Sequence, residues 1–230
     1  MRKLLIVVVL LLGAGVAADF GAARVFESRV TKALQRKYSL GERPIVQVRD
    51  FPFLPHLVSG RFSTIDLAAD DARARGITVD SLELHLRDVT VPRSVLLGGR
   101  GRVRVGRADG EITLAEAEVN RLLAEHLRGG SLMLGAGGVR LQVHTEALGQ
   151  PLTVLVDGRL SARGGRIAFT PQTVQVGGVR DPVLEKQLAS RFTFDVPLPA
   201  LPAGFTADRI DTEPGEALLA GHTGTVEVPA

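Results

Sequence analysis

The sequence predicts an α+β protein in which a long, curved antiparallel β-sheet wraps around amphipathic helices. Segments with a helical apolar period alternate with runs in which every second residue is apolar, in the order helix, strands, helix, strands, short helix, strands. The strand-like runs are joined by turns of hairpin length, which makes neighbouring strands antiparallel. The two halves are each a helix followed by a meander, an order that is also compatible with a degenerate structural repeat, although their residues do not align.

The chain opens with an export segment. Arg2 and Lys3 precede an unbroken apolar run from Leu4 to Ala18, and the positive end is expected to stay inside the cytoplasmic membrane. We expect residues 1–18 to be a signal peptide cut after Ala17 or Ala18. The alternatives are a retained membrane anchor and a buried helix of the folded domain. An anchor would have to continue past Asp19 to reach the ~20 apolar residues that span a bilayer. Export places the protein in the periplasmic space or cell envelope, with residues 19–230 as a single α+β domain.

Composition narrows the classes of function. The formal net charge of +3 is too balanced for a nucleic-acid binder, so we expect no nucleic-acid partner. Aromatic residues make up 4% of the chain and Trp is absent, which excludes the stacking surfaces of single-strand binders. The chain has no Cys, so no disulfide stabilises it, and its core must be built from aliphatic side chains.

The first half predicts one helix and several half-buried strands. Residues 24–38 have apolar residues at helical spacing and no Gly or Pro, with a helix end expected near Gly41. Period-two runs follow from Ile45, around Ile65, and from Ile77 to Val91. In the last of these the apolar parity changes after Leu86, which predicts a bulge near Asp88.

The second half repeats this order. A strand at 102–105 leads to a helix that Thr113 and Glu116 would open as a capping box and that Gly129-Gly130 would end. Further strands are expected at 139–143, 152–160, 166–170 and 173–176, with a turn at Gly149. A short helix beginning at Asp181 precedes a Pro-rich stretch of strand and loop.

Catalytic and metal-binding patterns are weak. The five histidines have no metal-ligand spacing, so we expect no metal site and no cofactor. His56 to Gly60 contains a serine but lacks the G-x-S-x-G elbow of hydrolases. Neither the glycines at 135–138 nor Asp70-Asp71 fits a phosphate loop or a catalytic carboxylate pair. We therefore predict a protein that is not an enzyme.

Two surface features suggest binding instead. Phe51-Pro52-Phe53-Leu54-Pro55, with Leu57 and Phe62, is unusually apolar for a connection between strands. It is either a loop covering the core or a lip that touches lipid or closes an apolar groove. In the second feature, Arg100, Arg102 and Arg104 would share one face of a strand, a row that suits phosphate or anionic head groups. The alternative is a solvated face with acidic partners on the neighbouring strand.

Several short motifs, taken in order, resemble the LmeA-like family of actinobacterial envelope proteins, long catalogued as a domain of unknown function. They are the export segment leading into the first helix, V-x-V-x-x-F-P-F-L at 46–54 with Gly60-x-Phe62, D-G-E-I-T at 109–113, and F-x-V-P-L at 194–198 with L-P-x-G at 201–204. Glu213-Pro214-Gly215-Glu216 departs from the pattern. The resemblance implies a phospholipid-binding fold like the BPI-like tubular lipid-binding proteins, and a role in making or maintaining lipid-linked envelope glycans. It supplies no catalytic residues.

A lipid site can be assigned on this basis. We expect apolar side chains to line the groove or its lip, while Arg100, Arg102 and Arg104 meet the phosphate of a phospholipid, most simply an anionic one at a membrane surface. The apolar set is Phe26, Val30, Phe51, Phe53, Leu54, Leu57, Phe62, Leu82, Leu84, Leu86, Val139, Leu141 and Val143. The competing functions are a structural or scaffolding envelope protein and an enzyme acting on a lipid-linked glycan. The sequence names no protein partner.

Overall fold

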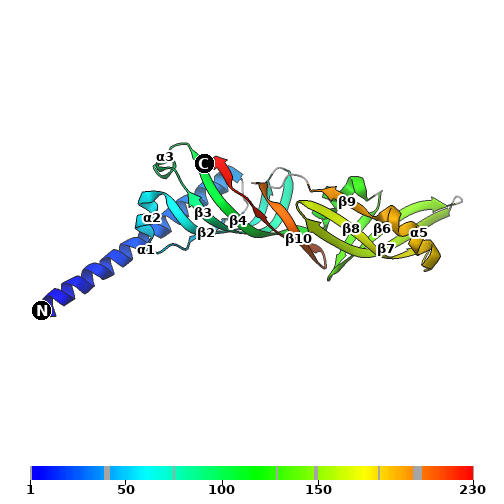
Figure 1. Ribbon diagram of the computed structural model, residues 1–230, viewed down its shortest axis with the longest axis horizontal. Coiled ribbons are helices and arrows are strands. Elements are labelled where there is room, and N and C mark those ends of the chain that lie inside the picture. Colours follow the sequence, from blue (N-terminus) through cyan, green and yellow to red (C-terminus); the bar gives the residue numbers. More distant parts are fainter. Residues whose placement is uncertain are drawn as a thin grey trace. The chain divides into compact units, whose positions relative to one another are not determined.

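The structure is a computed structural model that describes residues 2–38, 42–74, 76–127, 129–147, 150–180, 182–198 and 204–229. The described chain groups into two compact units (Figure 1). Unit 1 comprises Met1–Ala72, Glu83–Asp109 and Thr223–Ala230, and unit 2 comprises Arg73–Leu82 and Gly110–His222. The predicted helix end at Gly41, turn at Gly149 and helix start at Asp181 lie outside the described residues.

Unit 1 combines a long helix with part of a seven-stranded antiparallel sheet. The sheet has the order β1-β2-β3-β4-β11-β10, and β12 also pairs with β4, with Val228 opposite Val103. Strands β2, β3 and β4 contribute residues to both units, and so does β11 through its last residue, Thr223. The elements that lie wholly or partly in unit 1 are α1 (Arg2–Tyr38), β1 (Ile45–Val48), α2 (Phe53–Ser59), β2 (Arg61–Ala74), β3 (Ile77–Thr90), α3 (Arg93–Leu96), β4 (Arg102–Ala115), the end of β11 (Glu216–Thr223) and β12 (Val226–Pro229).

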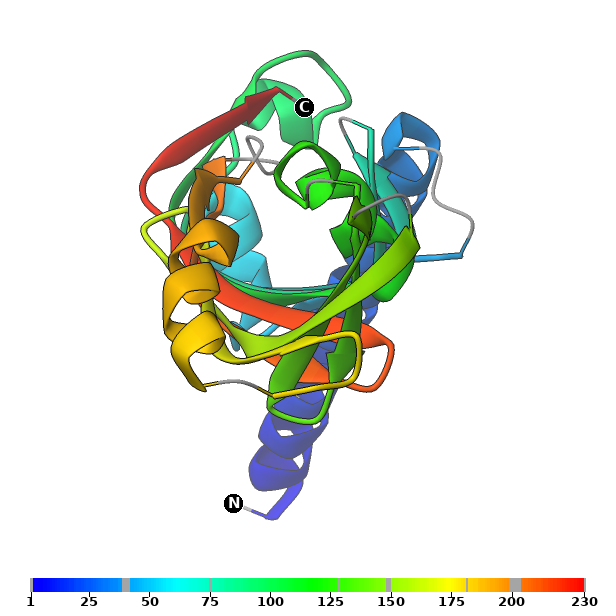
Figure 2. The same ribbon diagram turned by 90° about the vertical axis from the view of Figure 1, so that its right-hand side faces the viewer.

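Unit 2 contains a second antiparallel sheet with the strand order β5-β6-β7-β8-β9. Strand β10 lies against β7, and α5 packs beside β8, where Figure 2 shows it in gold. The elements are α4 (Glu116–Leu123), the 3-10 helix η1 (Ala124–His126), β5 (Ser131–Gly135), β6 (Gly138–Ala147), β7 (Gln150–Arg163), β8 (Arg166–Val176), α5 (Pro182–Phe192), β9 (Phe194–Pro197), β10 (Thr206–Glu213) and β11 (Glu216–Thr223).

The predicted fold class is confirmed as α+β with antiparallel strands, but the single long sheet is wrong. The strands form two separate sheets, because β5 to β9 pair only with one another among the described strands. In unit 1 an amphipathic helix does cover the sheet: Phe26, Val30 and Leu34 of α1 pack against the apolar cluster described below.

The export segment and the predicted helix at 24–38 form one continuous helix, α1. Residues 13–18 of α1 are exposed, which contradicts the buried-helix alternative for this part of the segment. Within the described part of the chain, no helix is both long enough and apolar enough to span a bilayer.

Two local predictions have different outcomes. The parity change in β3 is confirmed: Asp88 has φ +53°, the half-buried positions from Leu82 to Leu86 are even-numbered, and the buried Val89 and Val91 after it are odd-numbered. The capping box is wrong. Strand β4 continues through Ala115, so the Thr113 hydroxyl accepts a hydrogen bond from Ser81 (2.9 Å), and the Glu116 carboxylate accepts one from the Leu134 amide (2.7 Å).

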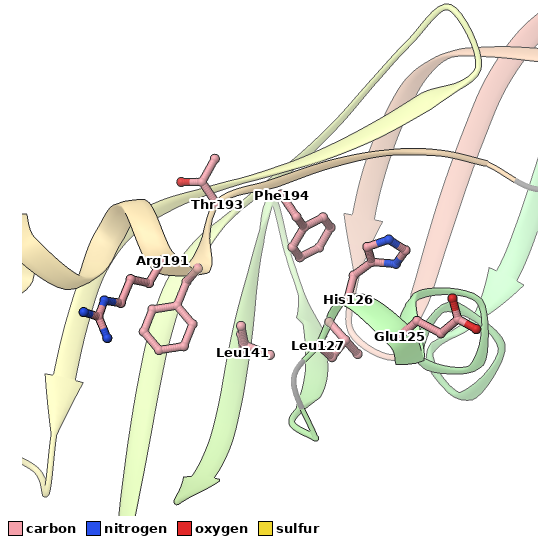
Figure 3. A pocket seen from close by; sticks show the side chains of 8 residues that line it. Glu125, His126, Leu127, Leu141, Arg191, Thr193 and Phe194 are labelled. Carbon is pink, nitrogen blue, oxygen red and sulfur yellow. The ribbon is translucent and has the colours of Figure 1, made fainter.

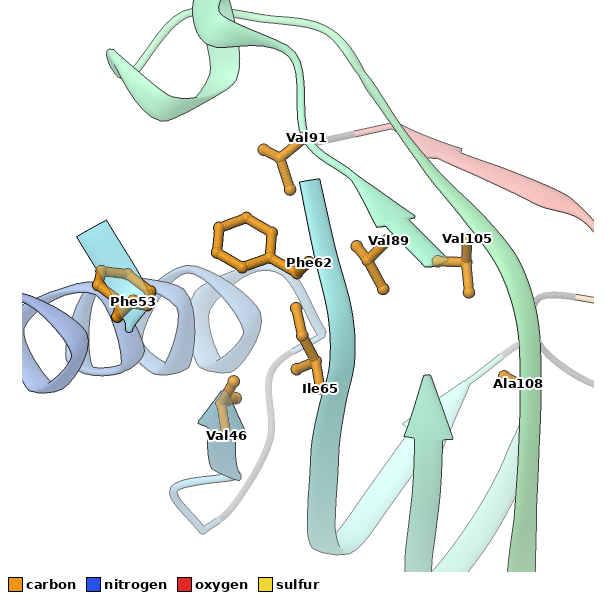
Figure 4. Close-up of a cluster of buried hydrophobic side chains, with 8 residues drawn as sticks. All are labelled: Val46, Phe53, Phe62, Ile65, Val89, Val91, Val105 and Ala108. Carbon is orange, nitrogen blue, oxygen red and sulfur yellow. The ribbon is translucent and has the colours of Figure 1, made fainter. Parts of the chain in front are cut away.

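The core of unit 1 is closed by three aromatic rings from three elements. Phe53 of α2 and Phe62 of β2 are each 1% exposed, and Phe26 of α1 lies 5.5 and 5.3 Å from them between ring centroids. Around them are the buried aliphatic side chains drawn in Figure 4, which come from β1, β2, β3, β4 and the segment after β3. An aromatic-poor chain thus places three of its nine Phe residues at one point.

Candidate functional site

The clearest candidate site is a pocket of about 230 Å³ that lies within unit 2 (Figure 3). It is lined by residues from η1 and the position after it, from β6, and from the junction between α5 and β9. These residues are Glu125, His126, Leu127, Leu141, Arg191, Phe192, Thr193 and Phe194.

The deep side of this pocket is formed by buried apolar side chains. Leu127 and Leu141 are 1% and 2% exposed. Leu141 points inward because β6 alternates, and its cross-strand neighbours Leu132 and Val156 are also buried. Hydrocarbon groups that enter the pocket would therefore meet hydrocarbon walls.

Aromatic rings form the next layer. Phe194 stacks on the fully buried Phe169 at 5.5 Å, and its ring also lies 6.3 Å from that of His126, beside which Figure 3 shows it. Phe192 and Phe194 are only half-buried, so both present apolar surface to the pocket. Thr193 is fixed between them, because its amide and hydroxyl both donate to the Ala189 carbonyl at 3.2 Å.

The rim is polar and exposed. Glu125, His126 and Arg191 are all exposed. Among the described residues, no hydrogen bond or ion pair engages the Arg191 guanidinium, which leaves its five N–H donors free for a ligand. Guanidinium and imidazole groups suit phosphate or carboxylate oxygens, and Glu125 adds one negative charge nearby. The pocket can therefore accept an apolar segment that carries a polar or anionic group at its outer end.

A second pocket, of about 190 Å³, lies in unit 1. Its lining consists of His56, Arg61, Phe62, Ser63, Asp88, Val89 and Thr90. The His56 Nδ1 atom faces the Arg61 carbonyl oxygen at 2.9 Å, and the Ser59 hydroxyl donates to the His56 backbone rather than to its ring. Across the described residues, no three acidic or histidine side chains cluster as a metal site.

The structure divides the predicted apolar set between the units. In unit 1, Phe26, Phe53 and Phe62 pack in the core with the half-buried Val30, Leu57 and Leu86, whereas Phe51 and Leu54 are 62% and 38% exposed. Leu84 is half-buried on β3, and so is Leu82, which belongs to unit 2. Val139, Leu141 and Val143 are buried on β6, and of the whole set Leu141 lines the larger pocket. Contact between any of these residues and lipid stays a prediction.

The predicted arginine row is only partly a strand face. Arg102 and Arg104 are exposed on β4, but Arg100 precedes that strand. Glu227 lies beside the row on β12: it is opposite Arg104 in the register and 3.5 Å from the Arg102 guanidinium. The acidic neighbour considered as the alternative is therefore present. In the described structure, Arg100 and Arg104 form no ion pair within 4 Å.

Sequence reasoning missed His126, Arg191, Phe192 and Phe194 as pocket residues. Phe192 ends α5 and Phe194 begins β9, so the helical and strand periods meet at Thr193 and neither period predicts where both rings point. The available signal was two aromatic residues flanking one polar residue at a helix end, in a chain with few aromatic residues.

Comparison with known proteins gives one result. No curated protein and no solved structure matches the chain. A family model described as LmeA-like phospholipid-binding matches residues 17–222 of the 230, which include all of the candidate site. The chain belongs to this LmeA-like phospholipid-binding family.

Proposed function

We propose that this protein is exported and binds a phospholipid by seating part of an acyl chain in the pocket of unit 2, with the phosphate near Arg191. One observation carries the proposal: a single pocket combines the buried apolar residues Leu127 and Leu141 with the exposed guanidinium of Arg191, which pairs with no residue of the described chain. A phospholipid has the same division between an apolar chain and a charged head.

The size of the pocket favours partial rather than complete uptake. Pockets that enclose a whole small ligand usually measure ~300–1,000 Å³, and this one measures about 230 Å³. A chain end would enter while the rest of the lipid stays in the bilayer. Because transfer from bilayer to pocket exchanges one hydrocarbon environment for another, the ~0.8 kcal/mol per CH₂ of burial largely cancels. Selectivity must then come from the head group.

We propose a preference for anionic lipids. Arg191 at the pocket rim is one candidate contact with the phosphate, and the predicted row Arg100, Arg102 and Arg104 is the other. Arg191 is favoured because it lines the same pocket as the buried Leu127 and Leu141, whereas Glu227 already neutralises part of the row. Guanidinium groups bind phosphate oxygens with paired hydrogen bonds.

The wider role follows from the export segment and the family resemblance. We propose a non-catalytic protein on the outer side of the cytoplasmic membrane that supports the synthesis or maintenance of lipid-linked envelope glycans. Phospholipid binding would serve this role by recruiting the protein to the lipid-linked glycans or by presenting them.

The pocket can be tested by blocking it. We would purify the chain without detergent and detect bound phospholipid by native mass spectrometry. Thr193→Trp places a large ring at the pocket mouth, whereas Thr145→Trp, at an exposed position on β6 outside the lining, is the matched control. We expect co-purified phospholipid in the parent and in T145W, and its loss in T193W. Equal lipid in both variants, or none in the parent, would contradict the proposal.

Charge reversal tests the head-group contact. Arg191→Glu should remove the preference for anionic over zwitterionic liposomes, and Arg159→Glu, an exposed residue of β7 outside the pocket, should leave it unchanged. A third protein, R100E/R102E/R104E, tests the row. Loss of the preference in this variant alone would move the head-group site to unit 1.

A further inference from the structure

Unit 1 carries an exposed apolar collar where α1 meets α2. The collar consists of Phe20 on α1 and of Phe51 and Leu54, at and just before the start of α2. Phe20 and Phe51 are 57% and 62% exposed, and their rings contact each other with centroids 5.8 Å apart. Two aromatic rings that meet in solvent leave apolar surface unburied, which marks an interaction site more often than a solitary exposed residue does.

An exposed carboxylate next to Phe20 would be unfavourable at a lipid contact, but the carboxylate of Asp19 is buried. Asp19 is 5% exposed, and its two oxygens accept hydrogen bonds from the amides of Phe53 and Leu54, each at 2.7 Å. Its charge is thus satisfied by amides of the first turn of α2 and is shielded from solvent.

The residue order along α1 indicates what kind of surface the collar binds. Along α1, the apolar run from Leu4 to Ala18 is followed by the buried Asp19 and then by Phe20 in the same helix, and Val16 and Phe20 lie one helical turn apart. The next turn brings the exposed Arg24, and the exposed Arg29, Lys32 and Arg36 follow. The only acidic residue in that stretch, Glu27, accepts a hydrogen bond from the Val48 amide at 2.9 Å. An apolar segment, aromatic rings and then cationic residues, in this order, match the depth profile of an anionic lipid surface.

We infer that the collar is the surface through which unit 1 sits on an anionic membrane, with Phe20, Phe51 and Leu54 at the level of the head groups and upper acyl chains. All three follow Ala18, so they remain whether or not the export segment is cut. This contact is distinct from the unit 2 pocket and does not depend on lipid binding there.

The absence of Trp from the chain makes a direct test simple. Phe51→Trp in the full chain gives a single indole at the collar, and Val179→Trp gives one at an apolar residue of unit 2 that is 67% exposed. Each protein would be mixed with phosphatidylcholine–phosphatidylglycerol vesicles whose acyl chains carry bromine, a contact quencher. We expect at least about a twofold loss of emission for F51W and little loss for V179W. Equal quenching of both, or none for F51W on vesicles that bind the protein, would overturn the inference.

Two further measurements test whether a second copy of the chain covers the collar and whether the cationic residues of α1 contribute to membrane binding. If a second copy of the chain covers the collar, F51W emission will shift with protein concentration without vesicles and sedimentation will show a dimer, and the inference fails. Replacing Arg29 and Lys32 by Gln should weaken binding to these vesicles by roughly tenfold. The matched pair R159Q/R163Q in unit 2 should not, and an equal effect of both pairs would count against the cationic part. Quenching of F51W without co-purified lipid would retain the collar and reject the pocket.

Discussion

The two units use their aromatic residues in opposite ways. In unit 1, Phe26 of α1 contacts both Phe53 and Phe62, and these two rings are each 1% exposed although Phe62 also lines the smaller pocket. In unit 2, Phe169 and Phe194 stack in a similar manner, but Phe192 at the end of α5 remains half-buried and a pocket stays open beside it. A helix that lies across a sheet face fills the core with its side chains, whereas α5 packs beside β8 and leaves volume that a ligand can use.

The largest expected effect tests whether the unit 1 core is filled. Phe62→Ala should lower the free energy of unfolding by about 3–5 kcal/mol, because it removes a fully buried ring and leaves a cavity. Phe194→Ala should cost less than half as much, because one side of that ring already faces the pocket. Urea denaturation measures both.

Phe51→Ala serves as the control for this pair, since a ring that is 62% exposed should change stability by about 0.5 kcal/mol or less. If Phe194→Ala costs as much as Phe62→Ala, the contrast between a filled and an open core is wrong.

The second prediction concerns how unit 1 holds α2 in place. Asp19→Ala leaves the Phe53 and Leu54 amides without their acceptor and should destabilise the protein by about 1–2 kcal/mol. Asp19→Asn keeps one acceptor oxygen and should cost less. Thermal unfolding of the three proteins would check this order, and identical melting temperatures for Ala and Asn would contradict it.

The third prediction concerns the hydrogen bonds that Glu118 of α4 accepts in unit 2. The pKa of the Glu118 carboxyl is lowered because Arg121 donates hydrogen bonds to it; burial opposes this shift, and the Thr78 amide, 3.0 Å away, adds to it. The unfolded chain therefore binds this proton more readily. The resulting stability is present above the unfolded-state pKa and is lost as the pH falls through the folded-state pKa.

Glu118→Gln should therefore cost about 1 kcal/mol near neutral pH, and the difference from the parent should shrink below about pH 4. Unfolding free energies measured between pH 3 and pH 7 would test this. A difference that grows towards acid would refute the assigned direction.

The smallest effect is expected at the arginine row. Arg102 and Glu227 form an ion pair with side chains that are 72% and 53% exposed, so Glu227→Gln should change stability by roughly 0–1 kcal/mol. The same substitution frees Arg102 and Arg104 from their acidic neighbour and should strengthen binding to anionic liposomes if the row contacts lipid. Unchanged liposome binding would leave Arg191 as the head-group contact.

Local periodicity predicted the elements better than their assembly. The alternation of Leu82, Leu84 and Leu86 and the break at Asp88 were readable because a strand places successive side chains on opposite faces. The division into two sheets depends on long-range pairing, which a period of two does not encode. Phe53 and Phe62 illustrate the limit: the pattern shows that they are apolar, but only the position of Phe26 on α1 decides that they form a core.

The capping box at Thr113 failed for a related reason. Ser/Thr-x-x-Glu predicts a helix start only where the backbone is free to turn, and pairing within the sheet keeps β4 extended through Ala115. The pocket could not be predicted from the sequence either, because its lining comes from three separate stretches of the chain that only the fold brings together.

The continuity of α1 fixes orientation as well as distance. A helix advances 1.5 Å and turns 100° per residue, so a rigid α1 sets the rotation of Phe20 and Phe51 about its axis relative to every residue before them. A flexible linker would let unit 1 swivel. Adding one alanine after Ala14 would instead turn the preceding helix by about 100° while moving it by only about 1.5 Å. The number of residues in α1 therefore determines which face of its N-terminal part lies on the same side as Phe20.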